Sequence, residues 1–245
     1  MAKRYLIKPE RSLFFFIPPR KEWGGSSRWA DQSLQYAVMQ DERSSEEKGE
    51  LPFNQIKNKW PKIRRIIIIL ASSDVNILHV GSPPLSESNL NLALPNLVEE
   101  HLLSTTTENI LIPSGRKNNK EVICVTDRKH VQDLAKTIHQ FWNKPIYFFA
   151  EQMSIPDPSS NNFFARISIF KENITLSAKT ENDVLHSMSL KNDSKVDSLD
   201  DVINLLINLN DKKNIELEIP DVLFAKHQDK NQTIEDGRSI SLKKY

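Results

Sequence analysis

An unbroken apolar run restricts the fold of this chain more than any other feature. Six consecutive apolar residues, Ile66 to Ala71, follow the arginines of "RRIIIILA". A strand with one covered face alternates apolar and polar side chains, whereas this run does not alternate. We therefore expect a strand covered on both faces, in a layered core. The run is also far below the roughly 18 residues needed to span a bilayer, so we expect the chain as given to be soluble.

Further strands are expected on both sides of that run. The candidates are "RYLI", "LFFFI" and "LQYAVM" before it and "VNILHV" after it. The charged stretch from Asp41 to Glu50 reads as a solvated loop, since it contains Ser and Gly and little that is apolar. The segment "FNQIKNKW" predicts a short helix, with Phe53, Ile56 and Trp60 on one face.

The middle of the chain has helical spacing around a predicted hairpin. Helical spacing places six side chains near one another, those of Leu90, Leu94, Leu97, Val98, His101 and Leu102. Ser86 or Ser88 are candidate caps, and Pro95 should kink or divide this helix. The strands "ENILIP" and "EVICVT" are joined by the polar loop "SGRKNNK". A second helix from Asp127 to about Trp142 then leads into the strand "IYFFA".

The last third returns to strands. We expect "FFARISIF", "ITLSAK" and "DVLHSMSL" to form a meander, followed by the helix "SLDDVINLLINLN", the strand "IELEI" and a polar tail. Strands, then helices, then strands again suggest two related halves that flank a middle insert.

The residues that carry chemistry are scarce. None of the six glycines lies in a phosphate-binding motif, so nucleotide hydrolysis and a bound cofactor are not expected. The six histidines lack metal-ligand spacing, and Cys124 reads as a buried strand residue, so we expect neither a metal site nor a catalytic residue. A net charge of +1 argues against nucleic acid as a partner. We therefore expect a chain that is not an enzyme.

Glu99 and Glu100 are the one conspicuous acidic pair beside an apolar helix stripe. Neighbouring residues on a helix diverge by about 100°, so these carboxylates cannot form an opposed acid and base pair by themselves. Two readings stay open, a solvated helix face and an acidic edge that docks a partner.

The segment from Arg65 to Phe149 resembles the cytoplasmic domain of type II secretion system protein L. The resemblance rests on an "L-x-A-S-D"-like turn, a Pro-containing junction, a helix of the form "L-P-x-L-x-E-E" and an Asp-Arg helix start. The matching residues are Leu70, Ala71, Ser73, Asp74, Pro83, Pro84, Leu94, Pro95, Leu97, Glu99, Glu100, Asp127 and Arg128. A further similarity lies in "IEDGRSISLKKY", which resembles the segment before the family's single transmembrane helix.

The resemblance implies an actin-like fold of the α+β or α/β class, with ribonuclease-H-type subdomains of mixed sheets and a helix-hairpin-helix subdomain between them. The ranges expected are 1–86 and 159–230 for the two ribonuclease-H-like subdomains, 87–158 for the middle subdomain and 231–245 for a juxtamembrane tail. It implies a non-enzymatic scaffold on the cytoplasmic face of the bacterial inner membrane, in a single-pass protein whose spanning helix this chain lacks.

The partner implied by the resemblance is the N-terminal domain of the secretion ATPase, with other inner-membrane platform proteins around it. Leu97, Glu99, Glu100 and His101 are the candidate contact residues. An alternative is an actin-like protein that binds nucleotide, as pilus-assembly relatives do. Contact of the basic tail with anionic lipid and formation of a homodimer are further hypotheses.

Overall fold

The computed structural model describes most of the chain up to residue 156 and parts of the remainder. The described residues are 11–23, 29–40, 44–81, 84–102, 105–117, 119–156, 162–170, 173–179, 185–191, 206, 214–219 and 239–244. The expected strand "RYLI" and almost all of the expected helix "SLDDVINLLINLN" lie outside them. None of the helices in these parts is long and apolar enough to cross a membrane.

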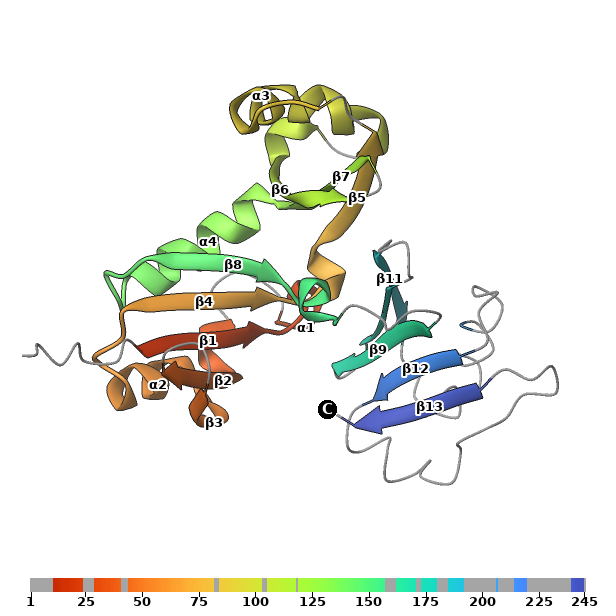
Figure 1. Ribbon diagram of the computed structural model, residues 1–245. Helices are drawn as coiled ribbons and strands as arrows, with labels where there is room; N and C mark the ends of the chain where they lie inside the picture. Colours follow the sequence, from red (N-terminus) through yellow and green to blue (C-terminus); the bar gives the residue numbers. More distant parts are fainter. Residues whose placement is uncertain are drawn as a thin grey trace, which may run out of the picture. The chain divides into compact units, whose positions relative to one another are not determined.

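The first of two compact units comprises residues 1–71 and 129–150. Its five-stranded sheet has the order β3-β2-β1-β4-β8 (Figure 1), where β1 pairs antiparallel with β2 and parallel with β4. The strands are β1 (Arg11–Ile17), β2 (Ser33–Gln40), β3 (Ser44–Pro52), β4 (Arg65–Leu70) and β8 (Ile146–Ala150). The helices are α1 (Arg20–Trp23), α2 (Phe53–Lys59) and α4 (Arg128–His139), with a 3-10 turn η1 (Trp29–Asp31).

An aromatic core joins one face of this sheet to its helices. The ring of Phe15 on β1 lies 5.4 Å from that of Phe53 on α2, and Phe53 lies 5.1 Å from Trp142, just after α4. Side chains alternate along a strand, so Leu13, Phe15 and Ile17 all point to this face and are fully or almost fully buried. On β4 the run Ile66–Ile68 is buried and Ile69 half-buried, which confirms the buried strand expected there.

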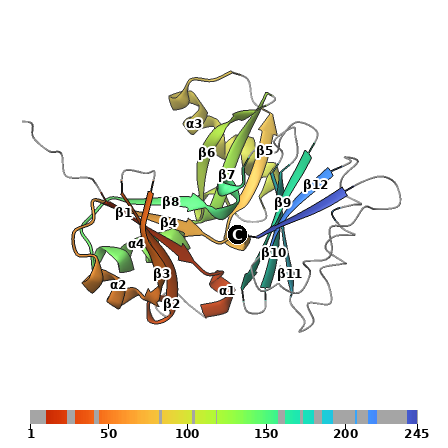
Figure 2. The ribbon, with the colours of Figure 1, turned by 60° about the horizontal axis from the view of Figure 1, so that its bottom comes forward.

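The second unit comprises residues 72–128 and 151–245 and contains two sheets. The smaller is the antiparallel sheet β5-β7-β6, which Figure 2 shows with α3 beside it. Its elements are β5 (Asn76–Gly81), α3 (Glu87–Val98), β6 (Asn109–Lys117) and β7 (Lys120–Asp127), with 3-10 turns η2 (Ser72–Asp74), η3 (Glu99–His101) and η4 (Thr106–Glu108). The expected hairpin is confirmed.

The larger sheet of this unit repeats the connectivity of the first unit's sheet. Its order is β11-β10-β9-β12-β13, with β9 antiparallel to β10 and parallel to β12. The strands are β9 (Asn162–Phe170), β10 (Asn173–Lys179), β11 (Leu185–Lys191), β12 (Asn214–Ile219) and β13 (Ser239–Lys244), and η5 (Glu151–Ser154) precedes them. The same order and directions in both sheets confirm two related halves.

The boundaries of the compact units differ from the ranges expected from the sequence. Strand β8 lies within 87–158 along the chain, yet it pairs with β4 in the first unit. A parallel partner is reached by a crossover, here through the insert and α4, so sequence order alone separates strands that are neighbours in space.

Three segments expected to be irregular form strands instead. Most of 41–50 belongs to β3, because its backbone pairs with β2 as a sheet edge, where charged side chains are tolerated. Much of the loop "SGRKNNK" belongs to β6 and β7, where Gly115 takes a φ of 135° at a register shift. The end of the polar tail forms β13, because Ile240 and Leu242 alternate with polar residues and pair with β12.

Candidate partner-docking surface

Helix α3 is fixed by an apolar cluster to the antiparallel sheet β5-β7-β6, which lies in the insert between β4 and α4. Leu90, Leu94 and Val98 recur every four residues, which places them on one face of the helix, and all three are buried. They pack with Val80 of β5 and with Ile123 and Val125 of β7, and Leu97 and Leu102 cover the edge of the cluster. This packing confirms the helix face expected from the sequence for its apolar residues, whereas His101, expected on the same face, is exposed.

The start of α3 is capped and its proline is accommodated. Ser86 is the N-cap, because its side-chain oxygen accepts from the backbone N–H of Asn89 at 3.4 Å. Helix α3 continues through Pro95 to Val98, so a division of the helix at Pro95 is wrong. Pro95 is exposed, and the buried residues on either side of it hold the helix to the sheet despite the missing backbone donor.

The predicted contact residues lie at the C-terminal end of α3. Glu99, Glu100 and His101 are exposed and together form the 3-10 turn η3, whereas Leu97 is half-buried against the cluster. A 3-10 turn separates neighbouring side chains by about 120°, so the two carboxylates diverge. Within the described residues neither carboxylate makes a hydrogen bond or an ion pair. A role in partner binding stays a prediction for all four residues.

An exposed leucine extends this surface along the helix. Leu92 is 80% exposed, the largest fraction among the exposed large apolar side chains of the described residues. We define the docking surface as Leu92, Glu99, Glu100 and His101, carried on a helix whose opposite face is locked in a core. The sequence pattern around Leu90–Leu102 did not single out Leu92, because helical spacing places it opposite the apolar face but does not predict how exposed its side chain is.

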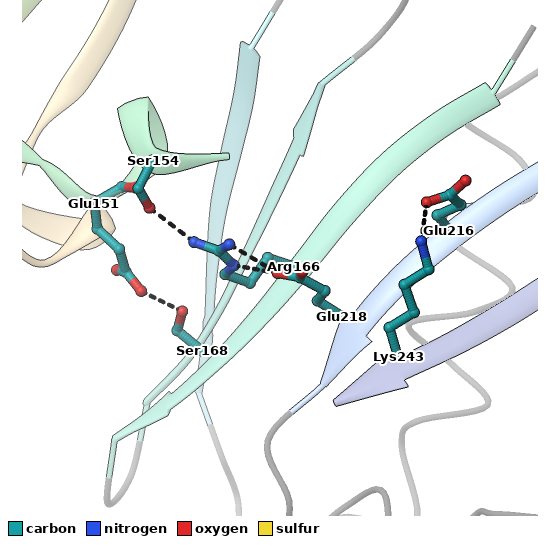
Figure 3. A network of polar contacts seen from close by, with 7 residues as sticks. All are labelled: Glu151, Ser154, Arg166, Ser168, Glu216, Glu218 and Lys243. Carbon is teal, nitrogen blue, oxygen red and sulfur yellow. Dashed lines mark hydrogen bonds and ion pairs between the residues drawn. The ribbon is translucent and has the colours of Figure 1, made fainter. Parts of the chain in front are cut away.

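A second group of polar side chains lies on one face of the larger sheet of the second unit (Figure 3). Glu151 accepts a hydrogen bond from the hydroxyl of Ser168. It also accepts hydrogen bonds from the backbone N–H and the hydroxyl of Ser72, at 3.1 and 2.9 Å. Arg166 donates to Glu218 at 2.8 Å and to Ser154 at 2.8 Å. Because these groups satisfy one another, the arrangement is a structural support.

Gln152 extends this support into the buried interior. Its side-chain nitrogen donates to the backbone carbonyls of Ser72 at 2.8 Å and Val75 at 2.9 Å, and the residue is 1% exposed. Ser72 lies within the "L-x-A-S-D"-like turn of the sequence resemblance. That motif predicted a turn at this position, but it did not predict the residues that hydrogen-bond to the turn. Sequence reasoning missed Glu151 and Gln152, because both act across about 80 residues of chain.

A charged cluster holds the outer strand of the first sheet. Glu47 on β3 accepts from the ammonium of Lys59 on α2 and from the hydroxyl of Tyr36 on β2. The Lys59 hydrogen bond, and then that of Tyr36, lowers the pKa of Glu47, and the bond to Glu47 raises the pKa of Lys59. Burial, and then the hydrogen bond to Glu47, raise the pKa of Tyr36. Nearby, Arg11 pairs with Glu46 at 2.7 Å.

The thiol of Cys124 and the possible metal ligands give no further candidate site among the residues that the structure describes. Cys124 is buried, as expected, and its burial raises the pKa of the thiol although Ser114 hydrogen-bonds to it. Within the described residues no group of three or more His, Cys, Asp and Glu side chains gathers in a metal-binding arrangement.

Comparisons with known proteins give a likeness in structure and none in sequence. No protein-family model matches the chain, and no curated protein matches it. The cytoplasmic domain of EpsL, an inner membrane component of the type II secretion system of Vibrio cholerae, is similar with a TM-score of 0.62 and 12% identity, over 86% of this chain and 83% of that chain.

Two further solved structures resemble the chain. One is a Bacteroides thetaiotaomicron protein with an actin-like ATPase fold and unknown function, with a TM-score of 0.52 and 14% identity over 94% of this chain and 91% of that one. The other is the PilM-PilN type IV pilus biogenesis complex, with a TM-score of 0.53 and 12% identity over 81% of this chain and 66% of that one. These likenesses confirm the expected actin-like fold class.

Proposed function

We propose that this chain is a non-enzymatic cytoplasmic scaffold of the type II secretion platform, which recruits the secretion ATPase to the bacterial inner membrane. The observation that carries the proposal is the likeness in fold to the EpsL cytoplasmic domain across 86% of this chain. It agrees with the resemblance between Arg65 and Phe149, which rests on sequence motifs.

The docking surface has properties that suit a protein partner. Leu92 offers apolar contact area, and the exposed Glu99 and Glu100 offer two negative charges just after the end of the same helix, neither of them paired with a residue that the structure describes. Charges at the rim of an interface steer association and make binding dependent on salt, while exposed apolar groups contribute affinity. The surface therefore fits a partner face with basic residues around an apolar centre, which we assign to the N-terminal domain of the ATPase.

Calorimetric titration of this chain with that ATPase domain tests the proposal. We expect saturable binding that weakens steeply as salt rises, and a loss of at least about tenfold in affinity for Glu99→Lys with Glu100→Lys. The matched control is Asp31→Lys with Glu50→Lys, an equal change in net charge at two exposed residues of the first unit. It should leave the affinity unchanged.

Two outcomes separate the parts of the proposal. Unchanged affinity in the Glu99 and Glu100 variant would remove these residues from the interface while leaving ATPase recruitment intact. Absence of any binding by the unsubstituted chain would contradict ATPase recruitment itself.

Nucleotide binding is the second candidate, because one similar structure has an actin-like ATPase fold. The scarcity of glycine argues against it, since phosphate loops bring backbone N–H groups close to the ligand. Titration with a labelled ATP analogue decides between the two, because saturable binding at micromolar concentration would overturn a scaffold without nucleotide.

Anionic lipid is a weaker candidate partner for the C-terminal strand. Lys243 on β13 pairs with Glu216 on β12 at 2.6 Å, so part of the positive charge expected to face lipid is neutralised within the sheet. Sedimentation with anionic vesicles at low salt tests this contact, and failure to sediment would exclude it.

A further inference from the structure

The sheet of the first unit has a second apolar face, opposite its aromatic core. Phe15 belongs to that core, and side chains alternate along a strand, so Phe14 and Phe16 point to the other side. The residues paired with them on β2 and β4, and those paired in turn on β8, point the same way. We call this side the open face and define it by Phe14, Phe16, Ala37, Ile67, Ile69, Tyr147 and Phe149.

The residues that the structure describes cover the open face incompletely. Tyr147 and Phe149 are 49% and 53% exposed, and Phe14, Phe16 and Ile69 are half-buried. The last three line an open groove of about 650 Å³. Strands β1, β4 and β8 run parallel (Figure 1), and parallel strands in a sheet are usually covered on both faces. The face and its groove therefore offer space for a further covering segment.

Two exposed charges lie at the β3 side of the groove. Lys48 and Glu50 both line it, and Lys48 lies in the same row of paired residues as Ala37 and Phe14. Glu50 follows two positions further along β3 and therefore points to the same face. Within the described parts of the chain neither charge makes a hydrogen bond or an ion pair. A segment that packs on the apolar groove can thus gain from a basic residue placed beside Glu50.

The chain carries apolar and basic residues in a matching order directly before β1. Residues 1–10, "MAKRYLIKPE", lie outside the described residues and are joined to β1 at Arg11. The apolar run Tyr5–Ile7 comes first on the way back from Arg11, and Arg4 and Lys3 follow it. The open face presents its groups in the same order, since the apolar row of Lys48 comes before the acidic residue in the direction of β1.

The length of the connection allows this segment to lie over the groove. Phe14 is three residues along β1 from Arg11, which corresponds to about 10 Å. A strand that packs on the face of a sheet lies about 10 Å from it, so the straight path from Arg11 to a point over Phe14 is about 14 Å. The six links from Tyr5 to Arg11 can span about 20 Å. Tyr5 can therefore reach a position over Phe14 and still leave length for a turn at Pro9.

We propose that residues 3–7 fold back over the open face, antiparallel to β1, as a covering segment of the same chain. The apolar run Tyr5–Ile7 then packs against the groove around Phe14, and the basic pair before it lies beside Glu50. A tethered segment is present at an effective concentration on the order of millimolar, so contacts too weak to hold a free peptide suffice. The inference concerns this chain alone and does not rest on the proposed ATPase recruitment.

Alkylation of a thiol in the groove tests the cover. Ala37→Cys places a thiol where the docked segment shields it from a maleimide. Replacing the apolar run Tyr5–Ile7 by three serines should raise the rate of alkylation at least about tenfold, because the groove is then open to the reagent. With the native segment the rate should not change with protein concentration, since the cover belongs to the same chain.

Leu92→Cys is the control, because its thiol lies on α3 in the second unit and should react within about twofold of the same rate with either segment. The native Cys124 is buried. Equal alkylation of Ala37→Cys with the native and the serine segment would overturn the proposal and leave the face to a separate partner. Protection that increases with protein concentration would overturn it in favour of a second copy. Thermal unfolding of every variant verifies that the fold is retained.

An exchange of charges tests the position of the basic pair. In the Ala37→Cys chain, Glu50→Lys should raise the alkylation rate at least about threefold, because it places like charges together. Adding Lys3→Glu and Arg4→Glu should bring the rate back to within about twofold of the starting value. The matched control is Asp31→Lys in η1, whose Trp29 packs on Phe53 on the core side of the sheet, and it should leave the rate unchanged. A rate that stays raised in the combined variant would overturn this position.

Cross-linking distinguishes the chain's own segment from other occupants. A short bismaleimide should join Tyr5→Cys to Ala37→Cys within one chain. It should not join Tyr5→Cys to Gln132→Cys, because Gln132 is exposed on α4, which packs on the core side, about 20 Å from the proposed segment. Products that join two chains in place of the product within one chain, or equal products for the two pairs, would overturn the proposal.

Discussion

The side-chain nitrogen of Gln152 lies 2.8 Å from the backbone carbonyl oxygen of Ser72, and this hydrogen bond joins segments 80 residues apart. The same nitrogen binds the carbonyl of Val75, so one amide satisfies two acceptors of the turn after β4. Glu151, the preceding residue, accepts hydrogen bonds from the backbone N–H and the hydroxyl of Ser72. Residues that are distant in the sequence thus hold this turn in place.

Gln152→Leu should destabilise the chain by about 1–3 kcal/mol, because it leaves two buried carbonyls without a donor while keeping a similar volume. Urea unfolding followed by circular dichroism measures the difference. The control Gln132→Leu makes the same change at an exposed site on α4 and should lie within about 0.5 kcal/mol of the unsubstituted chain. Equal effects of both substitutions would contradict the role assigned to Gln152.

Hydrophobic periodicity predicted the helices and strands whose pattern lies within the element itself. It failed for strands whose order depends on pairing with another segment of the chain. The leucines of α3 predict its buried face through their spacing, and this face is confirmed, as is the strand expected at "LFFFI". Strand β3 escaped prediction because its charges are balanced across neighbouring elements, Glu46 by Arg11 and Glu47 by Lys59. Strand β13 was not predicted because its six residues alternate only weakly between apolar and polar. Its strand conformation depends on pairing with β12.

The docking surface could be predicted only in part, for a related reason. The acidic pair was visible in sequence, and its exposure follows from its place just after the last buried turn of α3. Helical spacing places Leu92 off the apolar face of α3, but the exposed fraction of its side chain depends on the packing around the helix, which spacing alone does not give.

Acid should remove the stabilisation that Glu47 provides to β3. The folded-state pKa of Glu47 is lowered, first by Lys59, so its contribution is present above the unfolded pKa of about 4.3 and is lost as pH falls through the folded pKa. The pKa of Lys59 is raised, so its contribution is complete below about pH 10.4 and is lost as pH rises through the folded pKa.

The difference in unfolding free energy between the unsubstituted chain and Glu47→Gln should therefore be constant from about pH 6 to 9 and shrink below about pH 4. Denaturant unfolding at a series of pH values measures it. A difference that grows on acidification would contradict the assignment.

The thiol of Cys124 should resist alkylation in the folded chain. Burial raises its pKa and shields the sulfur, so the reactive thiolate is scarce and inaccessible at pH 8. We expect labelling by iodoacetamide to be at least about a hundredfold slower than in denaturant. Leu92→Cys, at the exposed position on α3, supplies a thiol that should react rapidly in the same folded sample. Rapid modification of Cys124 without denaturant would refute its buried placement.

Leu94 and Leu92 lie two residues apart on α3, yet their removal should have very different costs. Leu94 is 3% exposed within the apolar cluster and Leu92 is 80% exposed. Leu94→Ala should cost about 2–5 kcal/mol, since it removes buried methyl groups and leaves a cavity, whereas Leu92→Ala should stay within about 0.5 kcal/mol. Hydrogen exchange of the amides in β5 and β7 reports the stability of the insert directly. Leu94→Ala should accelerate that exchange and Leu92→Ala should not, because of these two residues only Leu94 packs in the cluster that holds α3 to its sheet. Equal exchange in the two variants would contradict the placement of Leu94 in the apolar cluster and of Leu92 outside it.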